Sequence, residues 1–156
     1  MDYYKLDHEA TKKDLDRFEY PNKRIGVISI IKNEKGEILL QQRGSASQDA
    51  KFQYENIGGS VEEYDTNYKV AILREIKEEA GEEIELETSD SIGIFHYESI
   101  GYHWIFIIYE FKYLGGEPKI IEKNKCERYD FFEPKEAIES NKVSEGCKKL
   151  LKSIFR

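Results

Sequence analysis

The segment AILREIKEEAGEE, residues Ala71–Glu83, combines apolar side chains with a dense set of carboxylates. On a helix of 3.6 residues per turn, four carboxylates fall within one arc of about 100°: Glu75, Glu78, Glu79 and Glu82. An apolar stripe for the core lies beside this arc: Ile72, Leu73, Ile76 and Ala80. The pattern predicts a helix from about Asn67 to Glu79 that ends at Gly81, because glycine tolerates the backbone of a helix C-cap.

The acidic face has two interpretations. Glu-rich helix faces are usually just solvated. Against this, like charges four residues apart destabilise a helix by a few tenths of a kcal/mol, and a helix C-terminus disfavours anions. Lys77 points away from the acids, and a pair between Arg74 and Glu78 leaves the other carboxylates uncompensated. A hard cation such as Mg²⁺ or Mn²⁺ would resolve the conflict, because it binds carboxylate oxygens.

The sequence upstream favours the metal site. NIGGSVEEYD places Gly58 and Gly59 shortly before the helix. Paired glycines allow close approach of the backbone, whose carbonyls can bind a metal, although Gly-Gly is also an ordinary turn signal. The metal site is the better interpretation because several features occur in a fixed order: paired glycines, acids, Arg-Glu, Glu-Glu and a final Gly.

The remaining segments predict a mixed α/β protein. Expected strands are Ile25–Ile31 and Ile38–Gln41, joined by an NEKGE turn, then 83–99, 102–114 and a short strand within 120–134. A polar loop is expected over 44–60, a short helix over Glu9–Phe18, and one or two helices from Pro134. Strands on both sides of a helix, with a helix at the end, predict a layered α/β sandwich.

Composition limits the function. The chain has 156 residues, which suits one domain, and its longest apolar run is far shorter than the roughly 20 residues of a membrane helix. Cys126 and Cys147 stand far apart without a CxxC, and the N-terminus lacks an apolar signal core, so we expect a reduced, cytoplasmic protein. The net charge of −7 argues against unassisted nucleic-acid binding, and an anionic substrate would require a screening cation.

These residues resemble the signature of the Nudix hydrolase family: Gly, five residues, Glu, seven residues, then Arg-Glu-apolar-x-Glu-Glu-x-Gly-apolar. Here Gly59 opens a box that runs to Glu82, and REIKEEAG (Arg74–Gly81) matches its second half. Asp65 stands in place of the first Glu and one residue is inserted before Arg74, which leaves the pairing of Arg74 with an upstream acid open. The resemblance covers roughly residues 24–155, which implies a catalytic domain over 24–156 behind an N-terminal extension of residues 1–23.

The resemblance implies an α/β/α sandwich with a mixed sheet and Mg²⁺-dependent hydrolysis of a nucleoside diphosphate linked to another group. Glu75 and Glu79 are the implied metal ligands, and the Gly58 carbonyl is a further one. Glu78 and Arg74 are the implied catalytic residues, with Glu78 either a third ligand or the group that deprotonates water. Family members also use a loop glutamate after the box, for which Glu122 and Glu127 are the candidates.

Substrate contacts are expected outside the box. Tyr102 and Trp104 could stack on a nucleobase, and Arg43 could meet phosphate, although core or surface roles are at least as common for such residues. The EPKIIEKNKC segment, residues 117–126, resembles the branch that hydrolyses nucleoside triphosphates.

Three alternatives remain beside that reading. An inactive nucleotide-binding module would be expected to lose acids of the helix, and an isopentenyl-diphosphate-isomerase-like enzyme would need a cysteine before the box. RNA decapping would need a basic stretch for a long RNA. The sequence keeps the acids of the helix, has no cysteine before the box and has no basic stretch. The expected partner is therefore a small nucleotide with a diphosphate, with no membrane; homodimers are known in the family by analogy alone.

Overall fold

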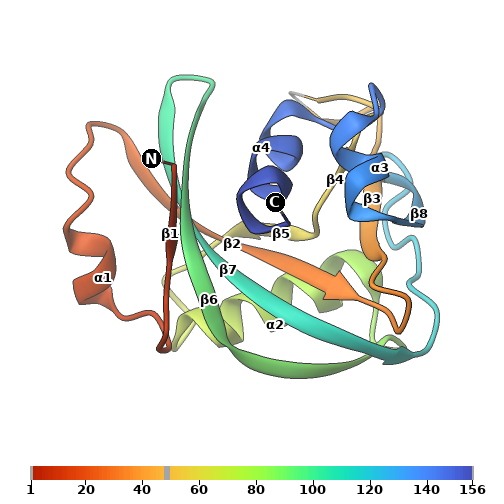
Figure 1. The fold of residues 1–156 in the computed structure, drawn as a ribbon, viewed down its shortest axis with the longest axis horizontal. Helices are drawn as coiled ribbons and strands as arrows, with labels where there is room; N and C mark the ends of the chain where they lie inside the picture. Colours follow the sequence, from red (N-terminus) through yellow and green to blue (C-terminus); the bar gives the residue numbers. More distant parts are fainter. Residues whose placement is uncertain (1, 48–49, 156) are drawn as a thin grey trace.

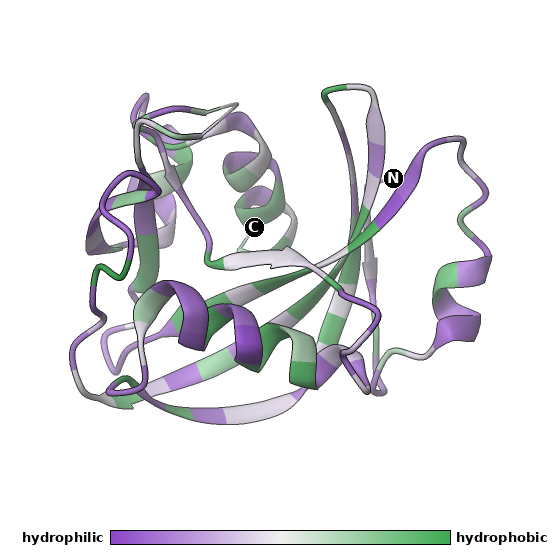
Figure 2. Ribbon diagram, turned by 180° about the vertical axis from the view of Figure 1, so that it is seen from behind, coloured by the Kyte–Doolittle hydropathy of each residue, from purple (hydrophilic) through white to green (hydrophobic). Residues whose placement is uncertain are grey.

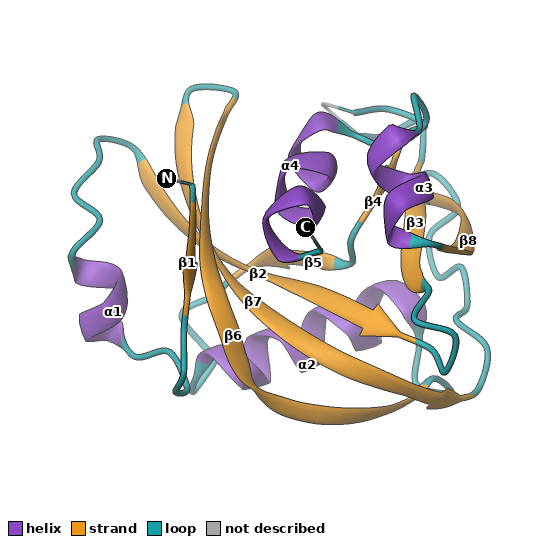
Figure 3. Ribbon diagram, in the orientation of Figure 1, coloured by secondary structure: helices purple, strands orange, loops and turns teal. Residues whose placement is uncertain are grey.

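The computed structural model describes residues 2–47 and 50–155, in which one mixed sheet is covered by helices on both faces (Figure 1; Figure 3). The strands are β1 (Tyr3–Lys5), β2 (Lys23–Lys32), β3 (Ile38–Arg43), β4 (Tyr54–Glu55), β5 (Gly58–Ser60), β6 (Glu85–Ser99), β7 (Tyr102–Gly115) and β8 (Cys126–Phe132). The helices are α1 (Lys12–Asp16), α2 (Tyr68–Ala80), α3 (Pro134–Glu139) and α4 (Glu145–Ile154).

The sheet is built around the long antiparallel pair of β6 and β7. β2 runs parallel to β7 over its whole length, from Lys23 opposite His103 to Lys32 opposite Lys112. β2 and β3 pair only at Lys32 and Ile38, next to their turn, and then diverge. β5 pairs with β2, whereas β4 and β8 flank β3. The predicted hairpin and mixed sheet are therefore confirmed, and the divergence of β2 from β3 makes room for β5.

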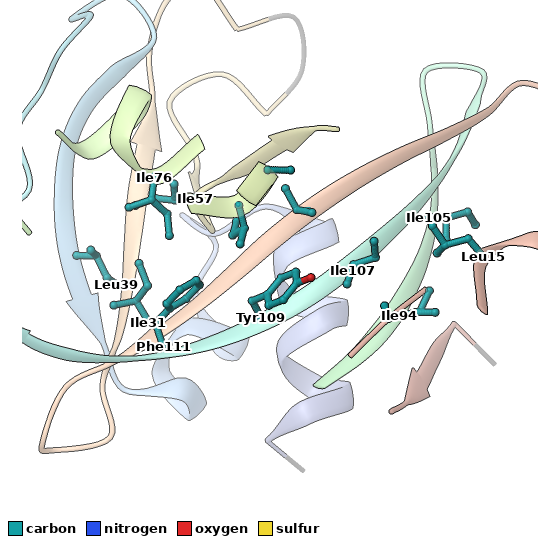
Figure 4. Packing of buried hydrophobic residues seen from close by; sticks show 14 of the residues in the cluster. Leu15, Ile31, Leu39, Ile57, Ile76, Ile94, Ile105, Ile107, Tyr109 and Phe111 are labelled. Atoms are coloured by element: carbon teal, nitrogen blue, oxygen red, sulfur yellow. The ribbon is translucent and has the colours of Figure 1, made fainter. Parts of the chain in front are cut away.

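Alternation along β7 divides the core into two clusters. Ile105, Ile107 and Tyr109 are fully buried on the face that carries α2 (Figure 4). Ile108 faces the other side, where it belongs to one cluster with Leu150 and Leu151 of α4. Successive strand residues point to opposite faces, so one strand supplies both cores. The result is the predicted three-layer α/β/α sandwich.

Helix α2 is delimited by the residues that the sequence indicated. The side chain of Asn67 accepts from the backbone N–H of Val70 at 2.9 Å, and Gly81 follows the helix with a φ of 88°. Hydrophilic and hydrophobic residues interleave along α2 (Figure 2). Leu73 was expected in the core but is 41% exposed, whereas Ala71, on the acidic side, is fully buried. The buried face therefore includes part of the acidic arc.

Glu82 was expected on that arc, but it lies beyond the end of the helix. Its carboxylate pairs with Lys77 at 2.8 Å, so Lys77 neutralises an acid that the helical period had placed elsewhere. The acidic face of α2 consequently carries three glutamates, Glu75, Glu78 and Glu79.

The prediction of a loop over 44–60 was wrong. The segment 44–60, of which Gln48 and Asp49 lie outside the described residues, was expected to be a loop but contains β4 and β5. Gly58 pairs with Ile28 of β2, and a β-carbon on Gly58 would stand 2.2 Å from the carbonyl oxygen of Val27. Here the Gly-Gly pair serves close strand packing instead of a turn.

The N-terminal segment also differs from the expectation. β1 pairs with the outer edge of β6, which sequence reasoning missed. The helix is confined to Lys12–Asp16, shorter than the predicted Glu9–Phe18. Glu9 is held outside it, because its carboxylate accepts from the Ser91 N–H at 2.9 Å and from the Tyr109 hydroxyl. Across the residues described, the structure has no helix with the length and apolar character that crossing a membrane requires.

Candidate active site

Arg74 of α2 organises the acidic face. Its Nε and Nη2 donate to the two carboxylate oxygens of Asp65, each at 2.9 Å, and Nη2 also donates to the Ser60 carbonyl at 2.9 Å. The Asp65 side chain is only 1% exposed, and the guanidinium holds the pKa of its carboxyl below the usual value. Asp65 therefore reaches Arg74 despite being shorter than Glu and shifted by one residue.

A turn ahead of α2 holds Asp65 in place. The backbone N–H of Glu62 donates to Asp65 at 2.8 Å, and the N–H of Asp65 donates to the Glu62 carbonyl at 3.0 Å. This turn presents the Asp65 carboxylate to the guanidinium from outside the helix. The pairing that the sequence left open is thus made.

Arg74 also contacts two glutamates of its own helix. Nη1 donates to Glu75 at 3.0 Å and to Glu78 at 3.1 Å. The expectation that Glu75 is uncompensated was therefore wrong. Burial raises the pKa of Glu75, and the positive charge of Arg74 opposes that rise. Glu78 differs in being 54% exposed, so its carboxylate is in contact with water.

Glu79 is the most deeply placed acid of the face. Its Oε1 accepts from Gln41 Nε2 of β3 at 3.1 Å, while its Oε2 is buried and has no hydrogen-bond partner among the described residues. Burial raises the pKa of Glu79 to about 8; the charge of Glu75 adds to the rise, whereas Gln41, Arg43 and the backbone of Gly58 oppose it. A buried carboxylate with an unpartnered oxygen is costly unless another group binds it.

These carboxylates fit a hard divalent cation in their chemistry. Glu75 and Glu79 supply oxygen donors from successive turns of one helix, and the buried Oε2 of Glu79 has no hydrogen-bond partner within the described part of the chain. Within residues 2–47 and 50–155, no three His, Cys, Asp or Glu side chains converge closely enough to form a complete metal site by themselves. Further ligands would come from backbone carbonyls, water or substrate, which is usual for Mg²⁺.

A cavity of about 560 Å³ extends from this acidic end over the sheet and beneath α4. Glu79, Gly58 and Arg43 line one part of it, and Tyr102 and Trp104 line another. The structure thus brings together five residues that the sequence singled out for metal and substrate contact. Glu75 and Glu78 are outside the lining, although Glu75 lies against Gly59, which is part of it.

The aromatic part of the cavity is larger than the sequence indicated. Trp104 and Phe106 stack almost in parallel, with ring centroids 5.2 Å apart. The guanidinium of Arg24 lies 4.0 Å from the centroid of the Tyr102 ring. Alternation along β7 could have identified Phe106, because Tyr102, Trp104 and Phe106 share one face. Arg24 carried no such signal, since it reaches Tyr102 only through the pairing of β2 with β7.

The two loop glutamates are not part of this cavity. Glu122 is 56% exposed and pairs with Lys125 at 3.1 Å, and Lys125, not Glu122, is among the lining residues. Glu127 is half-buried at the start of β8 and does not line the cavity either. The role of either acid as a metal ligand stays a prediction.

Comparison with known proteins identifies the family. A family model described as the NUDIX domain matches residues 22–153. The chain belongs to the Nudix family. Comparison with curated protein sequences gives no match. Helix α2 therefore lies within a Nudix domain, and it carries Arg74, Glu75, Glu78 and Glu79.

Solved structures share the Nudix fold. A MutT protein from Methanosarcina mazei has a TM-score of 0.74 at 24% identity, covering 87% of this chain and 94% of the other. A MutT Nudix hydrolase from Burkholderia pseudomallei has a TM-score of 0.71 at 24% identity, covering 86% and 99%. The Nudix domain of NrtR from Shewanella oneidensis, complexed with ADP ribose, has a TM-score of 0.66 at 12% identity, covering 93% and 97%. At the general level of the family, the chain is a pyrophosphohydrolase of nucleoside diphosphate compounds.

Proposed function

We propose that this Nudix chain hydrolyses nucleoside triphosphates at a phosphoric anhydride bond and that it requires Mg²⁺ or Mn²⁺. The observation that carries the proposal is the continuity of one cavity, which joins the carboxylate end at Glu79 to the aromatic residues Tyr102 and Trp104. A molecule with a polyphosphate at one end and a flat ring at the other matches both parts. The triphosphate preference is further supported by the resemblance of residues 117–126 to that branch of the family.

The carboxylate end would hold the cation. Glu75 and Glu79 are the proposed ligands, with the Gly58 carbonyl as a further one. The chemistry that the cation supplies when bound is neutralisation of the negative charge on the phosphates. An acidic site would otherwise repel such a substrate, and the chain carries a net charge of −7.

The proton-accepting role is best suited to Glu78. Its carboxylate is 54% exposed, and Arg74 Nη1 holds one of its oxygens at 3.1 Å. An exposed carboxylate beside a bound cation can take a proton from the attacking water. Arg74 is clamped in turn by Asp65 and the Ser60 carbonyl. We therefore assign Arg74 to catalysis as a positioning residue, which fixes the orientation of Glu75 and Glu78.

The other end of the cavity would bind the nucleoside. Trp104 and Phe106 present a stacked pair of rings, and a base gains about 1–3 kcal/mol from stacking on an aromatic side chain. Arg43 pairs with Glu55 at 2.7 Å and lies beside Glu79, where it can offer its charge to a phosphate. Guanidinium groups suit this role because they bind phosphate through two parallel hydrogen bonds.

The test is a hydrolysis panel read by mass spectrometry. Nucleoside triphosphates, nucleotide sugars, ADP-ribose and dinucleoside polyphosphates are each incubated with Mg²⁺, with EDTA, and with the Glu79→Gln variant. We expect Mg²⁺-dependent cleavage of triphosphates that EDTA and Glu79→Gln abolish. Preferred cleavage of another class would overturn the triphosphate assignment alone. No turnover of any compound by the folded protein would overturn the enzymatic proposal in favour of a nucleotide-binding module.

A further inference from the structure

Asn56 is a polar side chain of the cavity, and no sequence pattern assigned it a role. It lies between β4 and β5 and lines the cavity together with Phe95, Tyr97 and Leu150. Its Oδ1 accepts from the Cys147 thiol of α4, with 3.1 Å between oxygen and sulfur. Its Nδ2 is buried and, over the part of the chain that is described, has no hydrogen-bond partner.

The contact with Cys147 fixes which end of the amide remains available. Cys147 is buried in the first turn of α4, where its backbone N–H donates to the Ser144 hydroxyl at 3.3 Å. Burial raises the pKa of the thiol, which therefore keeps the proton that it donates to Asn56 Oδ1. With Oδ1 engaged, Nδ2 is the amide atom left for a ligand.

An unpartnered donor in such surroundings is informative. Buried amide N–H groups are nearly always hydrogen-bonded in folded proteins. A buried N–H group without a hydrogen bond costs the full free energy of its desolvation. Phe95, Tyr97 and Leu150 surround this part of the cavity with mainly apolar surface. A bound molecule that brings an acceptor to Nδ2 recovers this cost, whereas a molecule that brings a donor leaves both groups unpaired.

We propose that Asn56 selects the nucleobase of the substrate by donating from Nδ2 to a base carbonyl oxygen. The preferred bases are then those with a carbonyl where their counterparts carry an amino group: guanine over adenine and uracil over cytosine. An amino group in that position only donates hydrogen bonds, as does Nδ2 of Asn56, so the two groups cannot pair. The inference rests on the proposed function, because it assumes that the aromatic part of the cavity holds a base.

Base preference can be measured without catalysis, because Trp104 is the single tryptophan of the chain and lines the cavity. Its fluorescence is titrated with GMP, AMP, UMP and CMP in the absence of metal, using the full chain. We expect GMP to bind about tenfold more tightly than AMP, and UMP about tenfold more tightly than CMP, the difference that one well-placed hydrogen bond produces.

Three variants make the test specific to the amide. Asn56→Ala should abolish the difference between the paired nucleotides. Asn56→Asp keeps the shape but offers acceptors, and should reverse the preference towards AMP and CMP. Asn141→Ala removes an exposed asparagine outside the cavity lining and should leave all four affinities unchanged. Thermal unfolding is recorded for each variant; should Asn56→Ala fail to fold, the reversal in Asn56→Asp decides.

The inference and the proposed function fail in different ways. Equal binding of the four nucleotides, a preference that survives Asn56→Ala, or the absence of saturable quenching by any nucleotide would each overturn the role of Asn56. If the hydrolysis panel still shows Mg²⁺-dependent cleavage without base preference, the proposed function stands without it. If cleavage is absent while the base preference is found, Asn56 selects a ligand of a binding module.

Discussion

The carboxylate of Glu75 lies directly against Gly59 of β5: a β-carbon built on this glycine would stand 2.5 Å from Cδ of Glu75. The glycine is therefore required by the acid that follows it sixteen residues later in the sequence. The two residues meet because β5 pairs with β2 beneath helix α2. Space for an acid of the candidate site is thus provided by a missing side chain on the neighbouring strand.

Gly59→Ala should displace Glu75 and lower kcat about a hundredfold, because misplacing a site residue by about 1 Å costs that much. The loss should exceed what the change in thermal stability explains. Gly36→Ala is the control: Gly36 has a φ of 78° and no atom near its would-be β-carbon, so that variant should lose about 1 kcal/mol of stability and no activity. Equal kcat for Gly59→Ala and the unaltered enzyme would contradict the prediction.

Asp65→Asn should destabilise the fold by about 3 kcal/mol, because it removes the most buried of the three carboxylates that pair with the Arg74 guanidinium. Asp90→Asn provides the matched comparison: Asp90 is 66% exposed, pairs with Lys69 at 3.1 Å, and should contribute at most about 1 kcal/mol. Both values are obtained from chemical denaturation at neutral pH. Similar values for the two variants would show that the Asp65–Arg74 pair behaves like a surface pair.

Glu79 should make the metal-free protein less stable as pH rises. Its folded-state pKa of about 8 lies above the ordinary value of 4.5, so the neutral form is favoured by folding. This contribution is fully present below pH about 4.5 and is lost as pH rises towards 8, by at most about 1.4 kcal/mol per pH unit. The difference in stability between the unaltered protein and Glu79→Gln, followed from pH 5 to 9 in EDTA, should show this slope. A constant difference would exclude a raised pKa.

Divalent cations should stabilise the folded protein, and more strongly at high pH, because a carboxylate must lose its proton to bind a metal. At a Mg²⁺ concentration 100 times the dissociation constant the gain is about 2.7 kcal/mol. Calorimetric unfolding with Mg²⁺ or EDTA at pH 6 and pH 9 measures it. Glu79→Gln should lose most of the gain, whereas Glu87→Gln, which replaces an exposed glutamate of β6 outside the cavity lining, should keep it.

Trp104→Leu should raise KM for nucleotides about tenfold with little change in kcat, since base stacking is worth about 1–3 kcal/mol and Trp104 lines the cavity without being one of the proposed metal-binding or proton-accepting residues. Leu114→Ala, a 55% exposed residue at the other end of the same strand, should change neither constant. A fall in kcat with unchanged KM would instead place Trp104 near the reacting phosphates.

The sequence by itself determined the helix of the site. The helix begins after Asn67 and ends before Gly81 in the structure, as the sequence pattern predicted. Capping and positive φ are local properties of the chain, so sequence alone can indicate them. The 3.6-residue period also placed Glu75, Glu78 and Glu79 on one face. Strand alternation and the position of α2 among the strands were sufficient for the mixed sheet and the three layers.

Local patterns could not decide the environment of those acids. Periodicity gives the angle of a side chain about its helix axis, but not what lies opposite: Glu79 is buried by Gln41 of β3, whereas Glu78, one residue before it, faces water. Gly58 and Gly59, expected within a loop, form a strand because β2 offers a free edge where it separates from β3.

The aromatic end of the cavity depended still more on distant parts of the chain. Asn56 acquires its role from the thiol of Cys147, ninety-one residues away, and Arg24 meets Tyr102 across the parallel pairing of β2 and β7. Each of these contacts forms only when segments far apart in sequence are packed together. The sequence thus determined which groups can do the chemistry, and the tertiary structure decided which of them are desolvated, paired and brought to one cavity.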